Sequence, residues 1–162
     1  MSGWGLKLRE KDKKLLLELL KDARKPTGEL SEKTGVTRQT INNKIKKLKE
    51  NGVKFTIWIH PERFNLMRVF ILLITRPESK YKEETIKKLK KMDTVSQIHY
   101  ILGRYDMIIE VIVKDREELS AIVRELQDLP AVLKTEALVV YDTVKHTNES
   151  YILKALETLE VP

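Results

Sequence analysis

The sequence predicts an α+β protein in which an N-terminal winged helix-turn-helix precedes a C-terminal βαββαβ domain of ferredoxin-like topology. Leucine and isoleucine recur at helical spacing through the first 52 residues. Beyond them, apolar runs and amphipathic segments follow in the order strand, helix, strand, strand, helix, strand. We therefore expect a helix-turn-helix domain over 1–54, a connecting strand and linker over 55–66, a ferredoxin-like domain over 67–145, and a C-terminal helix over 146–162.

The N-terminal domain is expected to hold three helices. The first runs from about Glu10 to Asp22, and its buried stripe is predicted to contain Leu16, Leu19, Leu20 and Ala23, with Leu15 beside them. The second is short, from about Thr27 to Lys33, and Gly35 ends it. The third begins at Thr37, a residue suited to capping a helix N-terminus, and ends before Gly52.

The third predicted helix has two different faces. Ile41, Ile45 and Leu48 keep the i, i+4, i+7 spacing of a buried stripe. The opposite face is cationic and rich in amides, which can bond base edges, while lysines and the helix N-terminus suit phosphates. An ordinary solvated helix face would look similar. The residues expected to contact DNA are Arg38, Gln39, Thr40, Asn42, Asn43, Lys44, Lys46 and Lys47.

Charge is unevenly distributed along the chain. Residues 1–54 hold 15 Lys/Arg and 7 Asp/Glu, whereas residues 55–162 hold 16 and 17. All of the net charge of +7 therefore comes from the first third of the chain. A basic domain on a nearly neutral one favours a polyanion partner such as DNA, although a lysine-rich soluble surface would give the same numbers.

The rest of the chain is expected to form the second domain. Phe55, Ile57 and Ile59 alternate with polar or aromatic residues, which predicts a half-buried strand that Pro61 ends. The four strands of the sheet are predicted at 67–76, 95–101, 105–113 and 136–144. One helix between them faces the core with Ile86, Leu89 and Met92. The other starts near Asp115, buries Leu119, Ile122, Val123, Leu126 and Leu129, and stops at Pro130. The C-terminal helix is expected at about 149–159, with Ile152, Leu156 and Leu159 on one side.

Enzymatic chemistry is not expected. The chain has no cysteine, and His60, His99 and His146 do not stand in a metal-ligand spacing. There is no Gly-rich phosphate loop, and no cofactor is expected. No apolar run is long enough to cross a bilayer, and the N-terminus lacks the apolar core of a signal peptide, so a cytoplasmic protein with no membrane partner is predicted. An architectural DNA-coating protein, or RNA or protein binding through the winged helix, are alternatives to sequence-specific DNA binding.

Several motifs in fixed order resemble the Lrp/AsnC family of feast/famine regulators, over about Leu8 to Lys145. The motifs are Asp12 before the leucines, Asp22-Ala23-Arg24, Val36 to Ile41 leading to Leu48 and Gly52-Val53, Gly103-Arg104-Tyr105-Asp106, Asp115 with Leu119, and Pro130-Ala131-Val132. The resemblance implies a DNA-binding transcriptional regulator. It also implies homodimers that assemble to octamers, and control by an amino acid or related metabolite.

The resemblance also suggests an effector pocket at the hairpin turn around Gly103, where Asp106 would hold a ligand ammonium and Arg104 a carboxylate. The alternative is that Gly103 only makes the turn and Asp106 only caps it. The expected effector residues are Gly103, Arg104, Tyr105, Asp106 and Thr135.

Departures from the family pattern modify these expectations. Pro26 replaces a usual serine cap, so Thr27 is expected to cap the second helix instead. Lys44 and Lys49 replace a usual Arg and Glu. Leu102 and Ala137 stand where many members have threonine, which favours a hydrophobic or aromatic ligand.

Overall fold

The computed structural model describes residues 8–145 and 149–158. The chain divides into two compact units. One, here called the head, is the chain up to Ile57 together with the segment from Lys145 onward. The other, here called the body, is Trp58–Val144. The C-terminal segment therefore groups with the head and does not stand alone.

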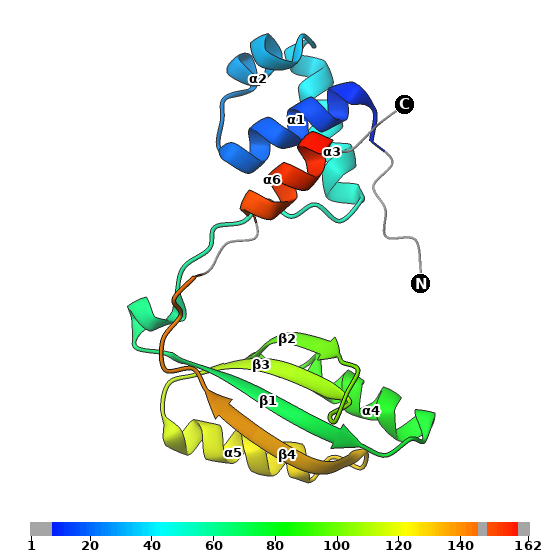
Figure 1. The fold of residues 1–162 in the computed structure, drawn as a ribbon, viewed down its shortest axis with the longest axis vertical. Coiled ribbons are helices and arrows are strands. Elements are labelled where there is room, and N and C mark those ends of the chain that lie inside the picture. Colours follow the sequence, from blue (N-terminus) through cyan, green and yellow to red (C-terminus); the bar gives the residue numbers. More distant parts are fainter. Residues whose placement is uncertain (1–7, 146–148, 159–162) are drawn as a thin grey trace. The chain divides into compact units, whose positions relative to one another are not determined.

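The head contains α1 (Glu10–Lys21), α2 (Thr27–Thr34), α3 (Arg38–Glu50) and α6 (Glu149–Thr158) (Figure 1). Each contributes apolar side chains to one core, and α2 does so through Leu30 alone. Leu15, Leu30 and Ile41 are completely buried there, and Leu48 and Leu156 nearly so. The three predicted helices of the helix-turn-helix are thus confirmed, but Ala23 is exposed, because α1 ends before it.

The turns of the helix-turn-helix have specific backbone and side-chain causes. Gly35 ends α2 with φ of +67°, in the left-handed region that glycine adopts without strain. The Thr37 hydroxyl caps α3 by accepting a hydrogen bond from the backbone N–H of Thr40 at 3.2 Å, as predicted. The prediction that Thr27 caps α2 was wrong. Thr27 is the first residue of that helix, and Pro26 occupies the capping position without a side-chain bond.

The predicted strand at Phe55–Ile59 is also wrong. Residues 53–60 form no strand in the described chain. Alternating apolar residues indicate that a segment could form a strand with one buried face. A strand also needs a hydrogen-bonded neighbour, and no strand of the described sheet pairs with this segment. A 3₁₀ turn, η1 (Pro61–Phe64), follows it.

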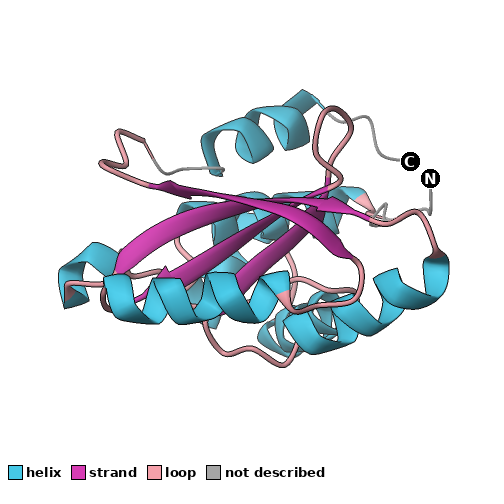
Figure 2. Ribbon diagram, turned by 90° about the horizontal axis from the view of Figure 1, so that it is seen from below, coloured by secondary structure: helices cyan, strands magenta, loops and turns pink. Residues whose placement is uncertain are grey.

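The body has the predicted βαββαβ order, made of β1 (Met67–Thr75), α4 (Ser79–Leu89), β2 (Val95–Tyr100), β3 (Met107–Val113), α5 (Arg116–Gln127) and β4 (Val132–Val139). The strands form one antiparallel sheet in the order β2-β3-β1-β4. Figure 2 shows them side by side in one twisted layer. This is the ferredoxin-like arrangement that the sequence predicts.

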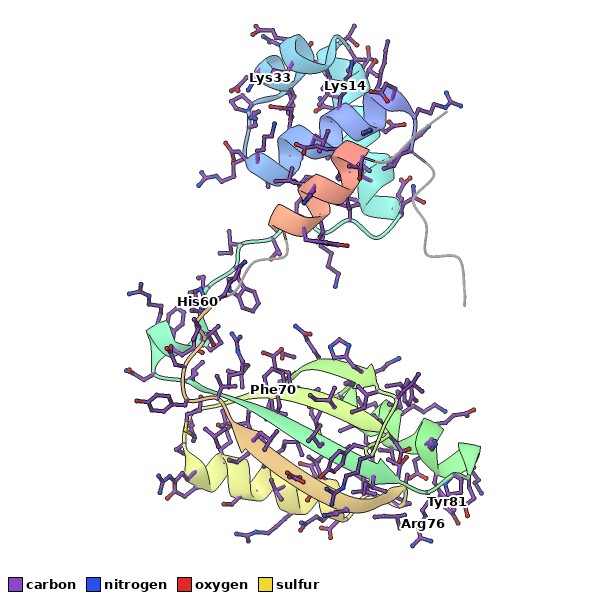
Figure 3. The ribbon with its side chains drawn as sticks, viewed as in Figure 1. Lys14, Lys33, His60, Phe70, Arg76 and Tyr81 are labelled. Carbon is purple, nitrogen blue, oxygen red and sulfur yellow. The ribbon has the colours of Figure 1, made fainter. Side chains whose placement is uncertain are left out.

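The core of the body lies on one face of the sheet. Val69, Ile71 and Leu73 of β1 are completely buried against the helices, which contribute Leu89 and Leu126. The pleat sends the alternate residues of β1 and β3 to the other face. Those residues include Phe70, which is labelled on β1 in Figure 3. We call this second surface the open face, because both helices of the body pack on the opposite side.

The extent of β4 and the buried face of α6 differ from the sequence prediction. β4 spans Val132–Val139 and not 136–144, because its register is fixed by pairing with β1, from Thr75↔Val132 to Val69↔Val139. In α6, Leu156 is buried but Ile152 is exposed, and Leu159 lies outside the described residues.

None of the helices in the described ranges is both long and apolar enough to span a membrane.

Candidate DNA-binding surface and effector site

The polar face of α3 is the candidate DNA-reading surface. Gln39, Asn42, Asn43, Lys46 and Lys47 are all exposed on it, opposite the buried Ile41. Their amide and ammonium groups are the donors and acceptors that base edges and phosphates require. Thr40 is half-buried, since its hydroxyl bonds that of Thr37 at 2.9 Å. Six of the eight predicted residues, Arg38 included, thus have exposed side chains.

Arg38 has a defined position beside α2. A Cβ added at Gly28 would lie only 3.1 Å from Arg38 Nη2, so the guanidinium lies against the first turn of α2. A cation and the unbonded N–H groups of a helix N-terminus are both attractive to phosphate. The location therefore suits contact with the DNA backbone.

Lys44 differs from the other predicted DNA contacts. Its ammonium forms an ion pair and hydrogen bond with Asp12 of α1, and both side chains are partly buried. Asp12 also accepts a hydrogen bond from the backbone N–H of Arg9 at 3.1 Å. Partial burial opposes ionisation of Asp12, but the Lys44 and Arg9 hydrogen bonds outweigh it and lower the pKa of this carboxyl group. Lys44 therefore joins α3 to α1.

A groove runs between α3 and the start of α1. Its polar lining comes from Arg9, Thr40, Asn43, Lys47 and Asn51, together with the Asp12–Lys44 pair. Arg9 and Asn51 were missed by the sequence analysis, because only tertiary packing brings Arg9 beside α3. The groove extends the polar surface of α3 with a cation from the residue that precedes α1.

A second charged cluster stabilises the head on the α1–α2 side. The Glu18 carboxylate pairs with Lys25 at 2.6 Å, Lys33 at 3.2 Å and Lys21 at 3.3 Å. The Lys25 hydrogen bond is the main reason that the pKa of Glu18 falls from 4.5 to about 2, against the opposing effect of desolvation. Lys14 and Lys33, labelled in Figure 3, also lie on the head.

In the body, four of the five predicted effector residues lie in the turn between β2 and β3. Gly103 has φ of +146°, and Arg104 stacks on the Tyr105 ring at 5.7 Å. Asp106 Oδ2 accepts hydrogen bonds from the backbone N–H and hydroxyl of Thr75, at 2.6 and 3.2 Å. Asp106 therefore caps the end of β1.

The same turn is joined to β4. The Tyr105 hydroxyl donates to the Glu136 carboxylate, and this bond is the main cause of a raised pKa for Tyr105. The neighbouring Thr135 hydroxyl instead accepts from Gln127 of α5 at 3.1 Å. Glu136 was missed by the sequence analysis, because Tyr105 and Glu136 become neighbours only through the sheet.

The open face has a buried charge pair among apolar residues. Arg68 Nε lies 3.0 Å from Glu110 Oε1, and each side chain is only 6% exposed. Ser96 donates to Glu110 at 2.8 Å, and the Trp58 ring covers the Arg68 guanidinium at 5.6 Å. Beside this pair, large apolar side chains are exposed on two neighbouring segments of the body. They are Trp58, Ile59, Phe64, Leu138, Val139, Tyr141 and Val144.

A helix-turn-helix whose third helix exposes amides and lysines, joined to a ferredoxin-like body, defines a DNA-binding transcriptional regulator with a ligand-binding domain. The Lrp/AsnC ligand binding domain model matches residues 68–150, and a winged helix-turn-helix DNA-binding model matches residues 8–53. The chain belongs to the Lrp/AsnC family. It is a transcriptional regulator and not an enzyme.

Relatives and solved structures agree with this assignment. The HTH-type transcriptional regulator FL11 of Pyrococcus abyssi is 33% identical over 144 residues, which cover 88% of this chain and 95% of FL11. The regulator Ptr1 of Methanocaldococcus jannaschii is 34% identical over 70% of this chain and 78% of its own. E. coli AsnC has a TM-score of 0.72 at 24% identity, over 88% of this chain and 98% of AsnC. A Neisseria meningitidis regulator in complex with L-Met has a TM-score of 0.76 at 23% identity, over 88% and 95%. At these identities the two structures show the fold alone.

Proposed function

We propose that α3 reads DNA through its exposed amides, and that the surrounding cations bind phosphates. The observation that carries this proposal is the exposure of Gln39, Asn42 and Asn43 together on the face opposite the buried Ile41. Amide side chains bond adenine edges bidentately, which supplies sequence choice. Arg38, Lys46 and Lys47 supply affinity, and Arg9 adds a cation to the same groove as Lys47.

The experiment is selection of bound duplexes from a random pool, followed by affinity measurements at several salt concentrations. We expect one enriched sequence and specific binding at least a thousandfold tighter than binding to unrelated duplex. Arg9→Ala should weaken binding to both DNAs by a similar factor. A selected pool without any enriched sequence would instead support an architectural DNA-coating protein.

The second part of the proposal concerns assembly. A homodimer is proposed to form through the open face and the exposed apolar segments beside it, and dimers to assemble to an octamer as the family resemblance implies. The body already has its own core, and these apolar side chains remain exposed outside it. Their burial against a second copy of the chain is therefore favourable. The site of action of such a DNA-binding protein would be the cytoplasm.

The third part concerns the effector, which we propose to be an amino acid or related metabolite bound at the β2–β3 turn. The family's ligand binding domain model covers this turn. Asp106 is half-buried and its Oδ2 accepts two hydrogen bonds from Thr75, whereas Glu136 is exposed and accepts one from Tyr105. The Glu136 carboxylate is therefore the stronger candidate for holding a ligand ammonium, with Tyr105 and Arg104 beside it. The fully exposed Leu102 favours a hydrophobic or aromatic side chain on the ligand.

Calorimetry with a panel of amino acids tests the effector. We expect a hydrophobic or aromatic amino acid to bind, and Glu136→Gln to weaken its binding by tenfold or more because the charge is lost while the shape is kept. Asp106→Asn should affect binding less. If no amino acid binds to the wild-type protein, the body would serve assembly alone.

A further inference from the structure

The C-terminal helix α6 is a structural part of the head. Leu156 is only 8% exposed and belongs to the same buried cluster as Leu15, Leu16 and Leu19 of α1. Figure 1 shows α6 beside α1, and the two helices are in contact. The ammonium of Lys13 on α1 donates to the backbone carbonyl of Glu157 at 3.3 Å.

The position of α6 in the sequence makes this packing unexpected. The DNA-binding model that matches the head ends at residue 53, and the ligand-binding model ends at residue 150, the second residue of α6. Neither model therefore includes the part of α6 that carries Leu156. The chain leaves the head after Ile57, forms the body, and returns to the head from Lys145 onward. Head and body are consequently joined by two chain connections.

We propose that α6 stabilises the folded head. The folding of α1 and α3 then depends on this helix, and DNA binding depends on that folding. The physical reason is the apolar surface of α1. The helix α1 carries three neighbouring buried leucines, Leu15, Leu16 and Leu19. Without α6, only α2 and α3 would cover these side chains. A three-helix unit of this size has little stability to spare. Leu156 covers apolar surface that would otherwise contact water.

Two variants on α6 separate this role from general effects of a substitution. Leu156→Asp places a charge in the buried cluster, whereas Tyr151→Asp makes the same charge change at a side chain that is 79% exposed. Hydrogen exchange of the full-length protein measures the two units separately. For Leu156→Asp we expect amides of α1 and α3 to exchange at least tenfold faster than in the wild type, while β1 and β3 stay unchanged. Tyr151→Asp should leave both units unchanged.

DNA binding provides the functional readout and rests on the proposed reading by α3. On a selected duplex, Leu156→Asp should weaken binding by tenfold or more, and the milder Leu156→Ala should fall between it and the wild type. Tyr151→Asp should stay within twofold. The stabilising role of α6 would be refuted if α1 and α3 exchange in Leu156→Asp at the wild-type rate. It would also be refuted if the two Asp substitutions have equal effects. If Leu156→Asp speeds exchange in α1 and α3 but the wild type binds no DNA, the stabilising role of α6 is supported. The proposed DNA reading by α3 is then refuted.

Discussion

Asp12 shows how one side chain can fix two helices at once. Its carboxylate caps α1 through the Arg9 N–H and pairs with Lys44 of α3. The sequence analysis assigned Lys44 to DNA by its position on a helical wheel, and noted Asp12 only as part of a motif. A wheel shows which residues share a face, but it does not show that α1 supplies a carboxylate to the flank of α3. The pairing of Asp12 with Lys44 was therefore outside what the sequence could predict.

The Asp12–Lys44 pair should stabilise the head more than it contributes to DNA binding. Asp12→Asn keeps an oxygen for the helix cap but removes the charge, so we expect a loss of about 1 kcal/mol of folding free energy. A double-mutant cycle with Lys44→Met, followed by thermal unfolding, measures the coupling. Additive effects of the two substitutions would show that the pair contributes nothing. Lys44→Met should also change the salt dependence of DNA binding less than Lys47→Met does.

The Glu18 cluster predicts acid sensitivity of the head. The folded-state pKa of Glu18, about 2, lies below its ordinary value of 4.5. The stabilisation from its three lysine partners is therefore complete above about pH 4.5 and is lost as the pH falls toward 2. Glu18→Gln should lower the melting temperature at pH 7, by an amount that corresponds to about 1 kcal/mol. The difference from the wild type should shrink between pH 4.5 and pH 2. A constant difference over this range would exclude Glu18 as the titrating group.

At the scale of elements, the sequence predicted helix stripes and caps well, but it did not predict which strands pair or in which register. The apolar stripe of α5 and the Thr37 cap involve residues within a few positions of one another, so the sequence shows them directly. The extent of β4 depends on its register with β1, more than 50 residues away, and the prediction began four residues too late. Residues 55–59 have the alternation of a strand, but no strand pairs with them within 8–145 and 149–158.

For the reading helix α3, two substitutions should separate sequence choice from affinity. Asn43→Ala should cost about 1–3 kcal/mol on the preferred duplex and little on unrelated duplex, because an amide contact discriminates between bases. Lys47→Ala should weaken binding to both duplexes alike and reduce the slope of log affinity against log salt by about one. Fluorescence anisotropy at four or more salt concentrations measures both effects. A uniform loss for Asn43→Ala would assign that residue to the DNA backbone.

At the scale of the whole molecule, the open face predicts self-association. Leu138 is paired with Phe70 in the sheet, lies on the open face and is 47% exposed. Leu138→Lys should leave the body folded, because the side chain is largely solvated in the single chain, yet raise the dimer dissociation constant by tenfold or more by placing a charge in the interface. Tyr81→Lys on α4 is the matched control, since Tyr81 is exposed and its helix packs on the other side of the sheet. Light scattering over a concentration series compares the two, and a monomeric wild type at micromolar concentration would refute the proposed dimer.

A two-fold dimer would present two copies of α3, and this symmetry makes a prediction about the DNA. Each copy reads one half-site from the major groove, so both can bind one face of the duplex only when the half-sites are separated by whole helical turns of about 10.5 base pairs. We expect affinity for duplexes carrying two inverted half-sites to rise and fall with that period as the spacing increases one base pair at a time. A duplex with a single half-site should bind more weakly than the best-spaced pair, because the second contact is then lost. Affinity that does not vary with spacing would mean that the two heads bind independently, and the connections between head and body would then not set the half-site distance.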